Sequence, residues 1–268
     1  MRIAALPMYD FAQLRLATDA FWRAISTRLQ DAGINEVPTA LGRAPDYTSA
    51  WRDPRLIIGQ ACGYPLFKNF TKRPRIVATP IYSAPGCKGP RHSSFFVVNA
   101  EASFGSLSDL RGCSCAINGP DSNTGMNLLR AAIAPLAQGH SFFGSVVITG
   151  SHSASVEAVA SGVVDLASID CVTFAHLQRF DSDLTARVRQ IGQSLLTPAP
   201  PFITAWETDG KTLCALRNIL KGIAADPVLE FVRAALLIAG FELVSDADYE
   251  LSLRIAREAA SNGYPMLR

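Results

Sequence analysis

Residues 119–133, GPDSNTGMNLLRAAI, place four small hydrogen-bonding residues directly before an apolar helical pattern. The four residues are Ser122, Asn123, Thr124 and Gly125. The first N–H groups of a helix have no intrahelical partner and carry about half a positive charge. Hydroxyl donors and a glycine that permits close approach turn such a helix end into an anion site without Lys or Arg. The stretch therefore predicts a helix cap, an anion site, or both.

The segments on either side alternate between apolar strands and amphipathic helices. Strands are expected at 2–6, 35–41, 55–60, 74–82, 94–100, 113–118, 145–150 and 164–170. Helices are expected at 11–33, after Ser122, at 153–162 and at 171–180. The C-terminal part is expected to be largely helical, with turns at Asp226-Pro227 and Gly240. This alternation predicts an α/β fold in which helices flank mainly parallel sheets.

Two extended segments, near 83–94 and 194–202, divide these elements into two groups. We therefore expect two lobes, of which the first is discontinuous. Residues 1–94 and 200–268 form the first lobe in this prediction, and residues 95–199 form the second. A ligand cleft between the two lobes is expected, because clefts between domains are favoured ligand sites.

Composition and charge exclude several classes of protein. The 268 residues are 49% hydrophobic and 18% charged, with a net charge of +2 and no long Lys/Arg run, so no nucleic-acid surface is expected. No stretch has the roughly 18 apolar residues of a membrane span. The first residues lack a secretory signal, which favours a cytoplasmic location, or a periplasmic one if an export signal was removed. The six cysteines show no disulfide framework and favour a reducing compartment.

Polar and aromatic side chains follow several other predicted strands, at the ends where ligands collect in open α/β sheets. Ser151 and His152 follow strand 145–150, and Asp170 ends strand 164–170. Ser151 and Asp170 each have an alternative role as a helix cap. Asp170 as a site residue would accept a hydrogen bond from the ligand and select its protonated form. The remaining candidates either line a cleft or pack in the core, and they are Tyr9, Tyr64 and Tyr82.

Six motifs occur in an order that resembles one known family. They are PMYD (7–10), QACGYPL (60–66), ATPIYSAPGCKGPRHSSFFVV (78–98), DLRG (109–112), NGPDSNTG (118–125) and GSHSASVEAVASGVVDLASID (150–170). Together they resemble the phosphate/phosphonate-type substrate-binding proteins of ABC transporters. The resemblance spans about residues 2–206. His92 stands where a tyrosine is common in that family, and Ser-Asn-Thr-Gly replaces a denser Ser/Thr run.

The resemblance implies the two-lobed, class II periplasmic-binding-protein fold and a protein that closes by a hinge on a small anionic ligand. It also implies an ABC transporter permease as partner. Residues 122–125 would hold the anionic head of a phosphate- or phosphonate-like ligand. His152, Asp170 and Tyr9 would contribute as further ligand contacts.

Other functions remain open at this point. The main alternative is an enzyme on the same fold that acts on a small biosynthetic precursor, and a ligand-sensing module is a third. Ser122, His152 and Asp170 could form a hydrolase triad, but the sequence has no G-x-S-x-G elbow. Cys62 with His152 could form a nucleophile pair. No spacing fits a metal, and no phosphate- or dinucleotide-binding loop occurs, so we expect neither metal nor cofactor.

Overall fold

The chain folds into two compact units in a computed structural model, which describes residues 1–44, 46 and 48–268. The first unit comprises Met1–Ser83 and Pro198–Ser245, and the second comprises Ala84–Thr197 and Asp246–Arg268. This division into two discontinuous units differs from the predicted division in one main respect. Residues 84–94 and 246–268 belong to the second unit, whereas the sequence analysis placed both segments in the first lobe.

The first unit is built around a five-stranded sheet of order β1-β2-β11-β3-β12. The strands are β1 (Ile3–Ala5), β2 (Leu56–Gln60), β3 (Arg75–Tyr82), β11 (Phe202–Thr204) and β12 (Ile238–Glu242). β1 and β2 pair in parallel, whereas β11 is antiparallel to β2 and β3, and β12 is antiparallel to β3. The helices are α1 (Arg15–Asp31), α2 (Gly63–Asn69), α7 (Gly210–Ala225) and α8 (Glu230–Ala235). The first sheet is therefore mixed, not mainly parallel as predicted.

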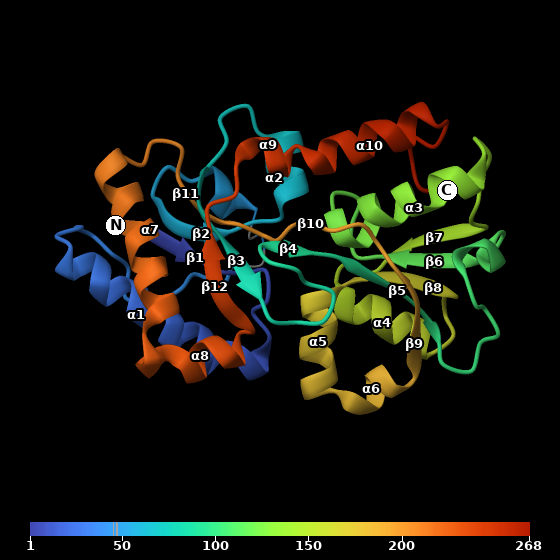
Figure 1. The fold of residues 1–268 in the computed structure, drawn as a ribbon, viewed down its shortest axis with the longest axis horizontal. Helices are drawn as coiled ribbons and strands as arrows, with labels where there is room; N and C mark the ends of the chain where they lie inside the picture. Colours follow the sequence, from blue (N-terminus) through green and yellow to red (C-terminus); the bar gives the residue numbers. More distant parts are fainter. Residues whose placement is uncertain (45, 47) are drawn as a thin grey trace. The chain divides into compact units, whose positions relative to one another are not determined.

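A second five-stranded sheet, of order β7-β6-β8-β5-β9, forms the centre of the second unit. Its strands are β5 (Ser94–Asn99), β6 (Ser114–Ile117), β7 (Ser145–Ile148), β8 (Leu166–Asp170) and β9 (Val188–Gln193). β6 pairs in parallel with β7 and β8, and β5 is antiparallel to β8 and β9. Its helices are α3 (Leu128–Ala137), α4 (His152–Ala160), α5 (Cys171–Phe180), α6 (Ser182–Ala186), α9 (Asp246–Tyr249) and α10 (Leu251–Ser261). Within this unit, α3 and α10 lie on one side of the sheet and α4, α5 and α6 on the other (Figure 1).

Short elements complete the chain. The 3₁₀ helices are η1 (Ala12–Leu14), η2 (Ser49–Arg52), η3 (Leu107–Leu110) and η5 (Pro227–Leu229), and a π-helical turn, η4, covers Asn123–Asn127. The strands β4 (Arg91–His92) and β10 (Thr197–Pro198) form a separate two-stranded sheet.

The C-terminal segment joins the second unit because its polar groups bond to α3 and to the loop that follows. Asn127 Nδ2 donates to the carbonyl of Ser252 at 3.0 Å, and Arg130, which is buried, donates to that of Pro265. The N–H of Phe142 donates to the carbonyl of Arg268 at 2.8 Å. A buried guanidinium left without these acceptors would be costly, so α10 and the last residues are part of the second unit.

Two predicted elements are wrong. Residues 35–41 form no strand: the segment follows β1 with isolated bonds, from Arg2 N–H to the Glu36 carbonyl and from Gly42 N–H to the Ala4 carbonyl. Glu36 has a positive φ of 58°, which interrupts extended backbone. In the C-terminal part, β12 stands where a helix with a turn at Gly240 was expected. The apolar run there fits either structure, and the antiparallel pairing with β3 decides it.

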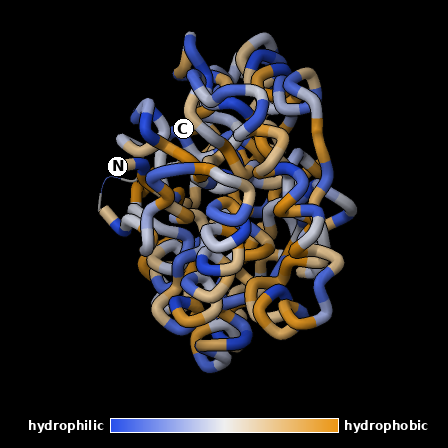
Figure 2. Tube along the Cα trace, turned by 90° about the vertical axis from the view of Figure 1, so that its left-hand side faces the viewer, coloured by the Kyte–Doolittle hydropathy of each residue, from blue (hydrophilic) through white to orange (hydrophobic). Residues whose placement is uncertain are grey.

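The predicted helix at 11–33 is confirmed as η1 and α1, and its apolar face lies in the core of the first unit. Phe21, Trp22, Ile25 and Leu29 are all at most 2% exposed. Full burial of each such side chain stabilises a fold by about 1.5–3 kcal/mol. Hydrophobic and hydrophilic stretches alternate along the whole trace (Figure 2), as expected for helices and strands with one buried side.

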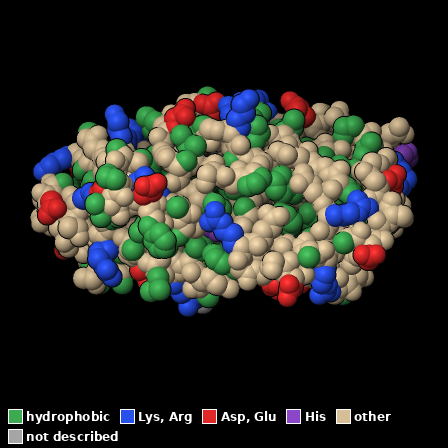
Figure 3. Space-filling view, turned by 60° about the horizontal axis from the view of Figure 1, so that its bottom comes forward, with side chains coloured by type: hydrophobic (Ala, Val, Ile, Leu, Met, Phe, Trp, Pro, Cys, Tyr) green, Lys and Arg blue, Asp and Glu red, His purple; other side chains and the backbone are tan. Residues whose placement is uncertain are grey.

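The surface carries charges of both signs. On the face shown in Figure 3, basic and acidic side chains are interspersed and form no continuous basic field. Over the part of the chain that the structure describes, no helix combines the length and the apolar character needed to cross a membrane.

Candidate ligand-binding site

Residues 119–133 contain the start of a helix whose first turn is unusual. Ser122 is its N-cap, and the Ser122 Oγ accepts a hydrogen bond from the N–H of Gly125 at 2.9 Å. The π-turn η4 follows, in which the N–H of Asn127 bonds to the carbonyl of Ser122 at 3.0 Å. The first N–H groups of a helix lack intrahelical acceptors. The cap therefore occupies the N–H of Gly125, whereas the N–H groups of Asn123 and Thr124 precede the first helical hydrogen bond, which Asn127 makes.

Two serines fix the position of that helix start. The Thr124 carbonyl accepts hydrogen bonds from Ser94 Oγ on β5 at 2.7 Å and from Ser168 Oγ on β8 at 2.6 Å. Both serines are fully buried. The sequence analysis missed them, although Ser168 precedes Asp170 by two residues and so shares its side of the strand. That alternation is the signal that could have identified Ser168.

Gly125 is required by a close approach to Asn118, which follows β6. A Cβ built on Gly125 would lie 1.8 Å from Asn118 Oδ1 and 3.1 Å from Ser122 Oγ. Asn118 Oδ1 is itself buried. The absence of a side chain at Gly125 thus serves packing against the end of β6.

The side chain of Asn123 is held by neighbouring side chains. Asn123 Nδ2 donates to Thr197 Oγ1 at 2.9 Å, and Asn123 Oδ1 accepts from Asn127 Nδ2 at 3.1 Å. Asn123 is buried. Its side chain therefore connects the helix start to Thr197 of β10 within the second unit.

His152 brings a second helix start to Thr124. It is the first residue of α4, whose N-cap Ser151 accepts the N–H of Ala154 at 3.1 Å. His152 Nε2 lies 3.1 Å from Thr124 Oγ1. Burial lowers the pKa of His152, and the nearby His92 lowers it further against the opposing effect of Asp170. His152 is therefore neutral at neutral pH. Ser151 itself is exposed, and its hydroxyl caps the helix.

Asp170 pairs with a histidine that sequence reasoning mentioned only as a departure from its family. Asp170 Oδ2 lies 2.8 Å from His92 Nδ1 on β4, and both side chains are 5% exposed. Asp170 Oδ1 accepts the N–H of Thr173 at 2.8 Å and so caps α5. Burial opposes ionisation of both groups, but their mutual contact raises the pKa of His92 and lowers that of Asp170. Below the raised pKa of His92, the two groups therefore form a buried ion pair in which the two charges offset each other.

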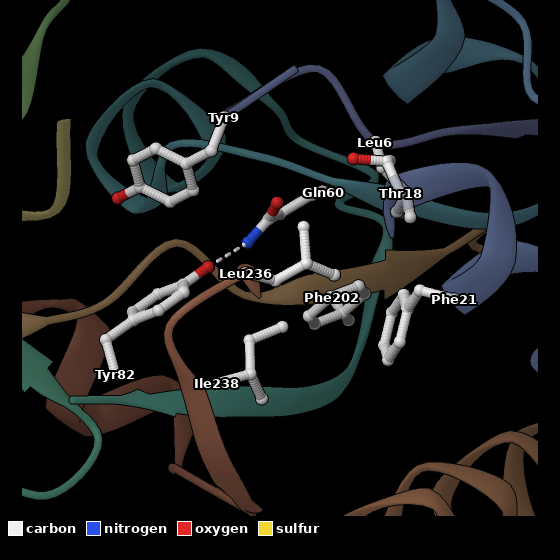
Figure 4. Close-up of a pocket in the computed structure, with 9 residues that line it drawn as sticks. All are labelled: Leu6, Tyr9, Thr18, Phe21, Gln60, Tyr82, Phe202, Leu236 and Ile238. Atoms are coloured by element: carbon white, nitrogen blue, oxygen red, sulfur yellow. Dashed lines mark hydrogen bonds between the residues drawn. The ribbon is translucent and has the colours of Figure 1, made fainter. Parts of the chain in front are cut away.

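Two of the three candidate tyrosines lie together in the first unit. The rings of Tyr9 and Tyr82 meet edge to face, with centroids 5.3 Å apart. Tyr82 Oη accepts a hydrogen bond from Gln60 Nε2 at 2.8 Å (Figure 4). These side chains border a cavity of about 30 Å³, large enough for water. Its lining residues are Leu6, Tyr9, Thr18, Phe21, Gln60, Tyr82, Phe202, Leu236 and Ile238.

Tyr64 lies apart from that cavity lining. It is a buried residue of α2, and Lys68 Nζ lies 5.3 Å from the centre of its ring. Tyr9 and Tyr82 therefore line the same cavity as Gln60, which the sequence analysis did not name as a site residue. Tyr64 lies on α2 and does not line that cavity.

Within the second unit, the geometry does not assemble the hydrolase triad that the sequence left open. The Ser122 hydroxyl accepts the N–H of Gly125, and the hydroxyl that His152 contacts belongs to Thr124. The Asp170 carboxylate pairs with His92. Within the described ranges, no cluster of three or more His, Cys, Asp or Glu side chains could hold a metal ion.

Several solved structures share the fold of this chain. A binding-protein component of an ABC phosphonate transporter from Pseudomonas aeruginosa matches with a TM-score of 0.77 and 16% identity, covering 97% of this chain and 87% of that chain. XAC2383 from Xanthomonas citri, bound to chloride, matches with a TM-score of 0.75 and 14% identity over 97% and 98% of the two chains. PhnD1 from Prochlorococcus marinus, in complex with methylphosphonate, matches with a TM-score of 0.74 and 14% identity over 96% and 98%. These likenesses confirm the two-sheet α/β fold of the binding-protein type.

Sequence comparison identifies the family. No curated protein matches the chain. The model of one family, described as "ABC transporter, phosphonate, periplasmic substrate-binding protein", matches residues 3–249. Its members are substrate-binding proteins and not enzymes, in agreement with the prediction from the ordered motifs. The chain belongs to the family of phosphonate-type periplasmic substrate-binding proteins of ABC transporters.

Proposed function

We propose that the second unit binds the head group of a phosphate- or phosphonate-like oxyanion at the start of η4. The observation that carries this proposal is the 3.1 Å contact between Thr124 Oγ1 and His152 Nε2, which joins two helix starts. The N–H groups of Asn123 and Thr124 and the hydroxyl of Thr124 are the proposed donors. His152 supplies a ring nitrogen as donor or acceptor, depending on its tautomer.

The charges around this point favour an anion. His152 is neutral, and the positive charge of His92 offsets the negative charge of Asp170. The helix starts of η4–α3 and α4 contribute positive potential. We therefore propose that Asp170 repels a doubly charged ligand less than an unpaired carboxylate would. Singly and doubly ionised oxyanions are then both accepted, in contrast to the selection for a protonated form that the sequence suggested.

We also propose that Tyr9, Tyr64 and Tyr82 of the first unit contribute when the protein closes on its ligand by a hinge motion. Ser151 contributes by capping α4, which positions His152. Family membership supports a periplasmic location and an ABC transporter permease as the partner that receives the ligand. Methylphosphonate is the first probe, because PhnD1, which shares the fold, was solved in complex with it.

Isothermal titration calorimetry with methylphosphonate, phosphite and phosphate tests the assignment of the site. Thr124→Ala should weaken binding by about 1–3 kcal/mol, or about 5- to 150-fold, because a buried anion loses a hydroxyl donor. Thr185→Ala is the matched control, since the Thr185 hydroxyl donates only to backbone carbonyls of α6 and its N-cap. Equal affinities of wild type and Thr124→Ala would remove Thr124 from the site.

A further inference from the structure

Two thiols that the proposed function does not use lie against each other in the second unit. Cys87 Sγ and Cys171 Sγ are 3.5 Å apart, although the residues are separated by 84 positions in the chain. All six cysteines lie within the described residues and are free thiols. A disulfide requires an S–S distance of about 2.05 Å, so the two sulfur atoms would have to approach by about 1.5 Å.

Backbone contacts hold the two cysteines in place. The N–H of Cys171 donates to the Ser93 carbonyl at 3.1 Å, and Ser93 Oγ donates to the Gly86 carbonyl at 2.8 Å. Gly86 has a φ of +86°, and a Cβ at that position would meet Cys171 Cβ at 2.9 Å and Phe95 at 2.7 Å. The loop that carries Cys87 is thus fixed against the start of α5.

The two thiols differ in exposure and in pKa. Cys87 is partly exposed, whereas Cys171 is buried as the first residue of α5. The hydrogen bond between them lowers the pKa of Cys171 and raises that of Cys87. Cys115 is a contrast, because burial alone raises its pKa to about 12.

We propose that Cys87 and Cys171 are a disulfide-forming pair that is oxidised by exchange with a small-molecule or protein disulfide. Cys87 loses its proton, and the resulting thiolate attacks the oxidant disulfide to form a mixed disulfide; the released oxidant thiolate takes up the proton and leaves as a thiol. The Cys171 thiolate then attacks Cys87 sulfur and releases the second oxidant thiol. The two protein thiols lose two electrons and two protons in all, and the oxidant disulfide gains them.

The crosslink would join two segments that support the His92–Asp170 pair. Cys171 directly follows Asp170, and Cys87 lies in the loop that leads to β4, which carries His92. The closed loop is long, and a crosslink across a long loop restricts the unfolded chain most. Oxidation should therefore stabilise the second unit whether or not the proposed anion site is correct.

The test compares the full chain after incubation with oxidised glutathione and with dithiothreitol. Intact mass should fall by about 2 Da on oxidation, and denatured protein should titrate two thiols fewer than the six of the reduced chain. Peptide mapping should recover Cys87 linked to Cys171. The Tm of the oxidised form should be about 5–10 °C higher than that of the reduced form.

Variants separate this pair from the other thiols. Cys87→Ser, at the partly exposed position, should abolish the mass loss and the Tm difference, whereas the exposed-site control Cys214→Ser should retain both. Cys171→Ala provides a second test of the same link. Six free thiols after oxidation, a glutathione adduct retained on Cys87, a link between other cysteines, or a Tm that does not rise would each overturn the proposal.

Discussion

Replacement of His92 by glutamine tests the charge balance of the candidate site. His92 Nδ1 and Asp170 Oδ2 are 2.8 Å apart, and both side chains are 5% exposed. At that distance and an effective dielectric constant of about 20, the attraction is about 6 kcal/mol before desolvation is subtracted. Removal of one partner of a buried pair costs about 3–5 kcal/mol, because the remaining charge stays buried. His92→Gln should therefore lower the Tm by about 6–15 °C.

The pH dependence of this loss has a defined sign. His92 has a raised pKa, so its contribution is complete below its ordinary value of 6.5 and is lost as the pH rises through the raised value. Asp170 has a lowered pKa, so its contribution is complete above its ordinary value of 3.8 and is lost as the pH falls through the lowered value. The difference between wild type and His92→Gln should thus be largest between about pH 4 and 6.5 and should shrink on both sides.

The assay is urea unfolding followed by circular dichroism across this pH range. The exposed His140 supplies a matched control, His140→Gln, which should change stability by less than about 0.5 kcal/mol. Addition of Asp170→Asn to His92→Gln should restore much of the loss, because no uncompensated buried charge remains. His92→Gln protein that is as stable as wild type, or a loss of stability that is equal at pH 5 and pH 9, would refute the ion pair.

Three further substitutions test individual contacts, each by the change in Tm or in urea unfolding. Gly125→Ala should destabilise by more than about 2 kcal/mol, because its Cβ would overlap Asn118 Oδ1; an unchanged Tm would contradict the close approach. Arg130→Met should destabilise by about 2–4 kcal/mol and release the C-terminal segment to proteolysis; an intact, protease-resistant segment would contradict its anchoring role. Tyr82→Phe should cost about 1 kcal/mol through the lost Gln60 bond, and no change would show that this bond is replaced.

Helices and strands were predictable where the spacing of apolar residues fitted only one of the two structures. The four apolar core residues of α1 repeat at helical spacing, and β2, whose five residues are all buried, begins with three consecutive apolar residues. Residues 35–41 carried apolar residues without a partner strand, and only the pairing geometry shows that they form no ladder. The apolar run 232–244 fits both a helix and a strand, so the sequence alone could not distinguish β12 from a helix.

Long-range placement was beyond the sequence pattern. The amphipathic face of α10 does not specify which unit it covers, and the bonds of Asn127 and Arg130 to the C-terminal segment decide the question. The sequence analysis also predicted too many parallel strand pairs. β11 and β12 return from the C-terminal part of the chain to the first sheet and pair there in the antiparallel direction.

Part of the candidate site was predictable because strand ends converge. Thr124 and His152 follow neighbouring parallel strands, β6 and β7, and the structure brings them into contact. The His92–Asp170 pair was not predicted, since β4 lies 78 positions before Asp170 and no local spacing connects them. The roles of all these residues in ligand binding stay predictions.

The most direct test of the account is a calorimetric titration of the purified wild-type protein with a panel of oxyanions at constant pH and salt. The panel comprises methylphosphonate, phosphite, phosphate, sulfate and a dicarboxylate. The account predicts one binding event for at least one phosphorus oxyanion. At about a hundredfold excess over its Kd, that ligand should stabilise the fold by about 2.7 kcal/mol. Absence of binding heat for every phosphorus oxyanion, or binding of the dicarboxylate alone, would contradict the assignment of the helix start at Ser122–Gly125 as an oxyanion site.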